Sequence, residues 1–224
     1  MPFVPAWRGV DRGKARRRHT MAKAKEAREE MVLQLTKIDV KLQGIAPVLF
    51  DRFTDYSQDV KPPEQKLYLG AGNVVCMPGA NITEGLLFGK EPGGAAKVFE
   101  GKKWADYIRM GLSHVFIDPV DVPFQRNGKP VILGEQGCKD EGWEIVMKAG
   151  RTKKGSLSIK QPPRPRPALL LPWELAFTIT LLKNDIIDET KLLNWFTRAG
   201  LLIALGTYRP TYGRFTVANW DVRG

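Results

Sequence analysis

The stretch Trp173-Glu174-Leu175-Ala176-Phe177-Thr178-Ile179-Thr180-Leu181 decides the fold class. Its large apolar residues stand at every second position, and this period is typical of a β-strand. Ile38, Val40 and Leu42 alternate in the same way with polar neighbours near the start of the globular part. The sequence therefore predicts two strands that are far apart in the chain, the earlier of them half-buried.

Helices and further strands are expected around these two. Asp188 can cap the N-terminus of a helix and Gly200 can end it. The inward face of this helix contains Leu192, Leu193, Phe196 and Ala199. Two shorter helical faces are expected, one with Ile82, Leu86 and Leu87 and the other with Trp104, Ile108 and Leu112. Other strands are expected at 73–77, 115–117, 143–148 and 215–222, and the strand at 115–117 is expected to be buried. Strands at both ends with helices between them indicate an α+β sheet with its helices on one face.

The charge balance points to a polyanionic partner. The chain has 224 residues, a net charge of +11 and a pI of about 9.7. Nucleic acid is the commonest partner of such a basic protein, and an anionic membrane surface is the alternative. No apolar run reaches the roughly 18 residues of a spanning helix, and the first residues lack the apolar core of a signal peptide. Cys76 and Cys138 form no metal motif, so a reduced, cytoplasmic setting is expected.

Two segments concentrate the basic residues. Residues 1–30 carry nine Lys or Arg against four Asp or Glu and are expected to form a basic arm, with Arg16, Arg17 and Arg18 contacting nucleic acid or a neighbouring subunit. A disordered N-terminus is the alternative. The globular domain then covers 31–224, with a turn-rich insertion at 119–168. Within it, residues 151–167 suggest a hairpin followed by an extended Pro-Arg-Pro-Arg-Pro piece. The cations of this segment would clamp a nucleic-acid backbone, or the segment is a solvated loop that its charges keep soluble. These cations are Lys153, Lys154, Lys160, Arg164 and Arg166.

A glycine-rich loop near the C-terminus is the other candidate binding site. It reads Leu205-Gly206-Thr207-Tyr208-Arg209-Pro210-Thr211-Tyr212-Gly213-Arg214-Phe215. Gly206 and Gly213 could let backbone N–H groups cradle a phosphate, while Arg209 and Arg214 bind phosphates and Tyr208 and Tyr212 stack on bases. The alternatives are turn glycines, solvated arginines and tyrosines packed on the edge of the sheet.

Catalytic groups are sparse. The chain has two histidines, His19 and His114, and no Walker loop, Ser-His-Asp set or Cys/His metal set. Asp51, Asp55 and Asp59 fit turn-forming roles. The sequence therefore predicts a protein that is not an enzyme and that uses no metal or cofactor.

Three segments, in this order, resemble a known superfamily. They are Leu42-Gln43-Gly44-Ile45-Ala46-Pro47-Val48-Leu49, then Met77-Pro78-Gly79-Ala80-Asn81-Ile82-Thr83-Glu84-Gly85-Leu86-Leu87, then the glycine-rich loop. The second is similar to the I-P-G-S-S-L-K-G element of CRISPR-associated RAMP proteins, especially the backbone subunits that line guide RNA. The third resembles the loop before their last strand. Glu84 and Phe88 stand where basic residues are usual, and the loop is also similar to stretches of phage-encoded proteins.

The resemblance implies a ferredoxin-like or RRM-like antiparallel sheet backed by two helices, with a basic hairpin inserted at 119–168 of a RAMP-like palm. It implies a non-catalytic, cytoplasmic subunit in antiviral defence that forms homo-oligomers along single-stranded RNA, with other effector subunits and no membrane. Single-stranded DNA remains open as the ligand. A structural protein of a virion or mobile element, whose arm contacts subunits or packaged genome, is one alternative function. A RAMP-type endoribonuclease that uses His114 is another.

Overall fold

The structure is a computed structural model that describes residues 34–52, 60–91, 93–149 and 163–223. The chain divides into two units, Met1–Gln34 and Leu35–Gly224, and all the elements named below belong to the second. Six predicted contact residues lie outside the described residues: Arg16, Arg17, Arg18, Lys153, Lys154 and Lys160.

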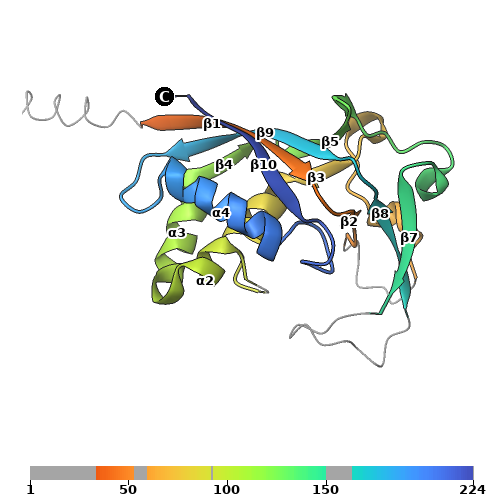
Figure 1. The fold of residues 1–224 in the computed structure, drawn as a ribbon, viewed down its shortest axis with the longest axis horizontal. Helices are drawn as coiled ribbons and strands as arrows, with labels where there is room; N and C mark the ends of the chain where they lie inside the picture. Colours follow the sequence, from red (N-terminus) through yellow and green to blue (C-terminus); the bar gives the residue numbers. More distant parts are fainter. Residues whose placement is uncertain (1–33, 53–59, 92, 150–162, 224) are drawn as a thin grey trace, which may run out of the picture. The chain divides into compact units, whose positions relative to one another are not determined.

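Strand β9 (Glu174–Leu182) lies in the middle of the main sheet. On one side it pairs with β1 (Leu35–Gly44), which pairs in turn with β10 (Phe215–Arg223). On its other side it pairs with β4 (Val115–Asp118). All these pairs are antiparallel, and helices join β1 to β4 and β9 to β10 (Figure 1). The order β10-β1-β9-β4 is that of a ferredoxin-like β-α-β-β-α-β fold, so the predicted α+β fold class is confirmed.

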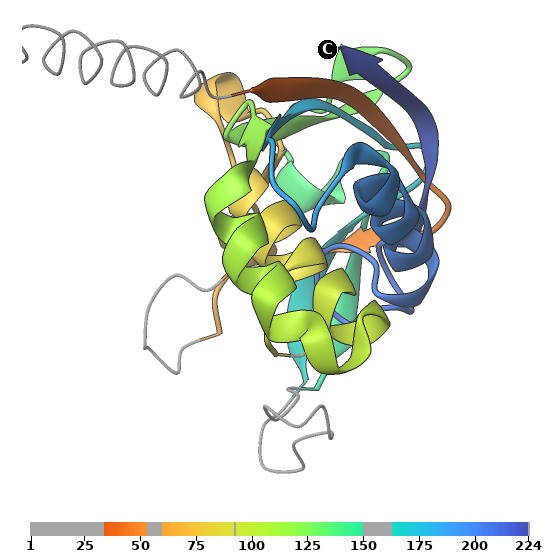
Figure 2. The same ribbon diagram turned by 90° about the vertical axis from the view of Figure 1, so that its left-hand side faces the viewer.

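The helices lie on one face of this sheet, as Figure 2 shows. They are the π-helical η3 (Asn81–Leu87), α2 (Ala95–Phe99), α3 (Trp104–His114) and α4 (Glu189–Leu202). The predicted apolar residues of β1 and β9 all point into the core between sheet and helices. The rings of Phe177 and Phe196 lie 6.0 Å apart there. The period-2 pattern therefore directs one face of the sheet to the helices and leaves the other polar.

The insertion between β4 and β9 contributes strands to two sheets. Its first part, β5 (Asp121–Arg126), extends the main sheet by pairing with β9 and with β3 (Cys76–Pro78). Its second part, β7 (Trp143–Lys148) and β8 (Arg164–Leu169), forms a smaller sheet with β2 (Val48–Leu49). Strand β8 contains the proline-arginine repeat, which is extended as predicted. The remaining short elements are η1 (Pro63–Lys66), η2 (Ala71–Asn73), η4 (Gly101–Lys103), β6 (Lys129–Pro130) and η5 (Gly137–Lys139).

Three local predictions were wrong. Gly200 does not end α4 but lies inside it, buried against the backbone of Phe215. Leu112 is 48% exposed, because α3 turns Gly111 toward the core instead. Phe116 is also 48% exposed, so β4 is only half-buried. The predicted N-cap is confirmed, since Asp188 accepts a hydrogen bond from the backbone N–H of Lys191 at 2.7 Å.

Candidate nucleic-acid interface

The segments 42–49, 77–87 and 205–215 meet in the folded chain. The backbone N–H of Thr207 donates to the carbonyl of Leu49 at 2.9 Å, and that of Gly213 donates to Pro47 at 2.7 Å. The Nη1 of Arg209 donates to the carbonyl of Gly85 in η3 at 3.2 Å. The three segments therefore form one surface, although they are distant in sequence.

The two predicted glycines of the loop have different roles. Both have φ of +75°, the left-handed region that favours glycine. A Cβ at Gly206 would stand 2.5 Å from the carbonyl oxygen of Leu49, so glycine is needed for this close approach. Gly206 is exposed, whereas Gly213 is buried and its N–H is used by Pro47. Gly213 thus shapes the loop, and only Gly206 can present its backbone to a phosphate.

A cleft of about 280 Å³ lies between the loop, η3 and the segment after β2. Its polar groups include those of Asp51, Asn81, Gly206, Thr207 and Arg209, and the rings of Phe50 and Tyr68 line it with Met77. The loop and η3 thus contribute to the same concave site, which is the geometry expected for ligand binding.

Arg209 is the most informative residue of this cleft. Its Nη1 donates only to carbonyl oxygens, those of Gly85 and Ala204, and burial lowers the pKa of its guanidinium. No carboxylate among the described residues forms an ion pair with it. An arginine stays protonated in proteins, so it holds an uncompensated positive charge in a partly desolvated cleft. A bound anion would stabilise this arrangement.

A buried charge cluster lies behind the cleft. Asp51 pairs with Arg166 at 2.7 Å and with Lys66 at 3.6 Å. Both cations are only 5% exposed, and burial lowers the pKa of Lys66. Two cations share one carboxylate, so the cluster carries one excess positive charge. Arg166 was predicted to contact phosphate, but its guanidinium is held inside the protein by Asp51.

Strands β7 and β8 pack against the loop. The guanidinium of Arg166 lies 5.3 Å from the ring centroid of Tyr208, and Lys148 Nζ lies 5.7 Å from that of Tyr212. These cation–π contacts bring together the loop and the basic insertion, which are far apart in sequence. Each tyrosine ring therefore already has a cationic neighbour. Of the other predicted contact residues, Arg164 begins β8 and Arg214 is exposed just before β10.

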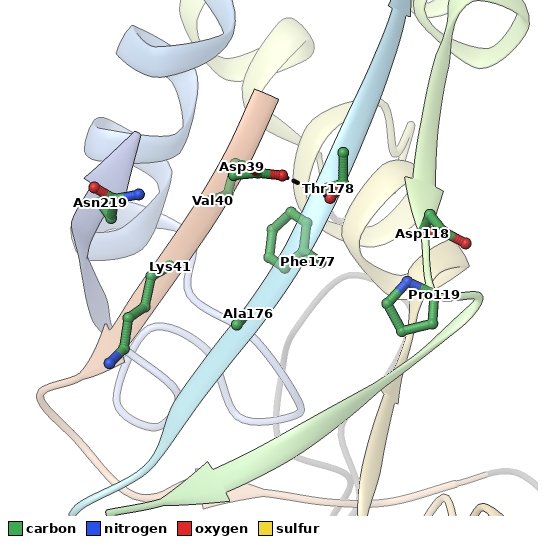
Figure 3. Close-up of a pocket in the computed structure, with 9 residues that line it drawn as sticks. All are labelled: Asp39, Val40, Lys41, Asp118, Pro119, Ala176, Phe177, Thr178 and Asn219. Atoms are coloured by element: carbon green, nitrogen blue, oxygen red, sulfur yellow. Dashed lines mark hydrogen bonds between the residues drawn. The ribbon is translucent and has the colours of Figure 1, made fainter. Parts of the chain in front are cut away.

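A larger hollow lies on the face of the sheet away from the helices, and Figure 3 shows its lining. Its volume is about 400 Å³. Asp39 accepts a hydrogen bond from Thr178 at 2.8 Å, which together with Arg223 lowers the pKa of this carboxyl. Lys41 pairs with Glu174 at 2.9 Å. Because these charges have partners, this hollow is a weaker candidate for binding an anion.

Four contributors to the interface were not identified as such from the sequence: Asp51, Lys66, Asn81 and Lys148. Asn81 stands within a motif that resembles the RAMP element, and Asp51 was interpreted as a turn residue. Lys66 and Lys148 carry no sequence signal. Within the described ranges, no group of three or more His, Cys, Asp or Glu residues could hold a metal ion. No helix in that part of the chain is long and apolar enough to cross a membrane.

The chain is similar to a chain in the cryo-EM structure of the Type III-B Cmr-beta bound to cognate target RNA. The TM-score is 0.49 and the sequence identity 16%, over 95% of this chain and 68% of that chain. No family model matches the chain, and no curated protein matches it.

Proposed function

We propose that this protein binds single-stranded nucleic acid, with RNA as the preferred ligand, by placing a backbone phosphate in the cleft beside Arg209. The observation that carries the proposal is the partly buried guanidinium without a carboxylate partner among the described residues. A phosphate would supply the missing negative charge, and the exposed backbone of Gly206 lies in the same cleft. The net charge of +11 favours the approach of any polyanion.

We extend the proposal to a non-catalytic, cytoplasmic backbone subunit of a CRISPR-like ribonucleoprotein filament. Its support is the resemblance of three segments to RAMP proteins and the way in which those segments meet in the folded chain, where two of them line the cleft. In such a filament the protein would form homo-oligomers along the RNA beside other effector subunits. The arm and the hairpin would add cations along the same backbone.

The test is the binding of a single-stranded RNA by the full chain across a series of salt concentrations. Arg209→Gln should weaken binding about tenfold, the size expected for losing a charge-assisted hydrogen bond. It should also reduce the slope of log K against log salt by about 0.7, because one phosphate contact is lost. Arg109→Gln is the matched control, since Arg109 is exposed on α3 and pairs with Asp106. The proposal fails if wild-type binding is absent or insensitive to salt, or if both variants behave alike.

A further inference from the structure

The two walls of the cleft differ in hydrogen-bonding character. Arg209 supplies donors, while Asp51 supplies acceptors from the segment after β2. Each oxygen of Asp51 is used once, Oδ2 by Arg166 and Oδ1 by Lys66, and the side chain remains 31% exposed. A carboxylate has about four lone-pair sites, so Asp51 can accept further hydrogen bonds from a ligand.

Asn81 adds a second polar group to the lining of the cleft, from η3. It begins η3, and its Nδ2 makes a long contact of 3.6 Å with the sulfur of Met77. Its Oδ1 accepts no hydrogen bond from the residues that the structure describes. Besides the hydroxyls of Tyr68 and Thr207, the cleft therefore contains the acceptor oxygens of Asp51 and Asn81, in addition to the cation.

A carboxylate is an unexpected neighbour for a phosphate, because like charges repel at short range. Here the two buried cations outweigh the charge of Asp51, so the cluster as a whole does not exclude an anion. What Asp51 retains is its capacity to accept a hydrogen bond. The group that suits it is a neutral donor attached close to the phosphate.

The size of the cleft favours a sugar hydroxyl as that donor. Its volume of about 280 Å³ lies just below the range of roughly 300–1,000 Å³ that encloses drug-sized ligands. A phosphate and its sugar fit such a space better than a complete nucleotide with its base. The ribose 2′-hydroxyl is present at every position of RNA and absent from DNA.

We infer that Asp51 and Asn81 read the ribose 2′-hydroxyl of the nucleotide whose phosphate lies beside Arg209, which makes this cleft selective for RNA over DNA. The inference rests on the proposed function, because it assumes a phosphate at Arg209. It adds the chemical basis of selectivity, which is a hydrogen bond from the sugar hydroxyl to the carboxylate of Asp51, whose charge is compensated by Arg166 and Lys66.

The experiment compares three oligonucleotides of one sequence and about 15 nucleotides, within the range of single-strand site sizes. They are RNA, DNA and 2′-fluoro RNA, which keeps a ribose-like sugar but lacks the hydroxyl donor. Wild-type protein should bind RNA about tenfold more tightly than the other two, as expected for a hydrogen bond to a charged group. Asp51→Asn, which keeps the size of the side chain, should reduce this preference to about twofold.

Asn81→Ala provides a second variant that leaves the buried charge cluster intact, so the test stands even if Asp51→Asn does not fold. It should also reduce the preference for RNA. Asn219→Ala, at the hollow on the opposite face of the sheet, should leave the preference unchanged. Arg209→Gln should weaken the binding of all three oligonucleotides alike.

Equal wild-type affinities for RNA and 2′-fluoro RNA would overturn the inference and leave the proposed function standing. A preference for RNA that survived both Asp51→Asn and Asn81→Ala would overturn the assignment to these residues. Absence of binding to all three oligonucleotides would remove the proposed function and the inference together.

Discussion

Replacing Gly206 by alanine tests the link between the fold of the loop and its binding. Gly206 has φ of +75°, and a Cβ there would stand 2.5 Å from the carbonyl oxygen of Leu49. The left-handed conformation alone costs alanine about 1–2 kcal/mol. The overlap with Leu49 adds about 1–3 kcal/mol, because backbone on both sides must move. The same movement breaks the hydrogen bond from Thr207 to Leu49 and displaces Arg209.

Gly72→Ala is the matched control for this substitution. Gly72 also has a positive φ, of +68°, but a Cβ there meets nothing within 4 Å. Its cost should be the conformational strain of about 1–2 kcal/mol only. Thermal unfolding should therefore show Gly206→Ala melting lower, by about 2–4 °C for each additional kcal/mol in a protein of this size. RNA binding should fall for Gly206→Ala alone. Equal melting temperatures, or unchanged RNA binding by Gly206→Ala, would refute the reasoning.

Three other predictions concern the stability of the fold. Gly200→Ala should lower the free energy of unfolding by about 1–3 kcal/mol, measured by thermal unfolding, because the new Cβ would overlap the carbonyl of Phe215. In the control Gly85→Ala the new Cβ meets no atom within 4 Å, so this substitution should be neutral or stabilising. Asp188→Ala should cost about 1 kcal/mol in denaturant unfolding, because α4 loses its N-cap. Burial raises the pKa of Cys138 from 9.0 to about 12, so wild-type stability should fall as the pH rises from about 9 toward 12, and Cys138→Ala should show a smaller fall.

Local patterns were sufficient for the two central strands of the sheet, β1 and β9. The alternation in β1 and β9 predicts which side chains are buried, because the period of a strand needs no knowledge of its neighbours. Gly200 shows the limit of prediction from local sequence patterns. Helix termini and close helix–strand contacts both favour glycine, and only the position of β10 distinguishes them. Leu112 was misplaced for a similar reason, since the packing of α3 decides which of its sides is covered.

The candidate site was predictable in its segments but not in its chemistry. The loop and the basic insertion were identified from composition, and the structure places Tyr208 beside Arg166. Composition could not distinguish Arg166 from Arg209, because both are arginines beside prolines. The difference is the carboxylate of Asp51, which is 115 residues away from Arg166 in sequence and 2.7 Å away in space.

The two arginines also indicate how binding energy should be distributed over this surface. A base that stacked on Tyr208 would compete with Arg166, which already lies over that ring. Arg166 is held by Asp51 and by the carbonyl of Lys148 at 2.6 Å, and moving it would leave a buried charge without its partner. Arg209 has no such partner to give up among the described residues. Affinity should therefore depend more on the phosphate beside Arg209 than on stacking against Tyr208, and sequence preference should be weak because phosphates carry no base identity.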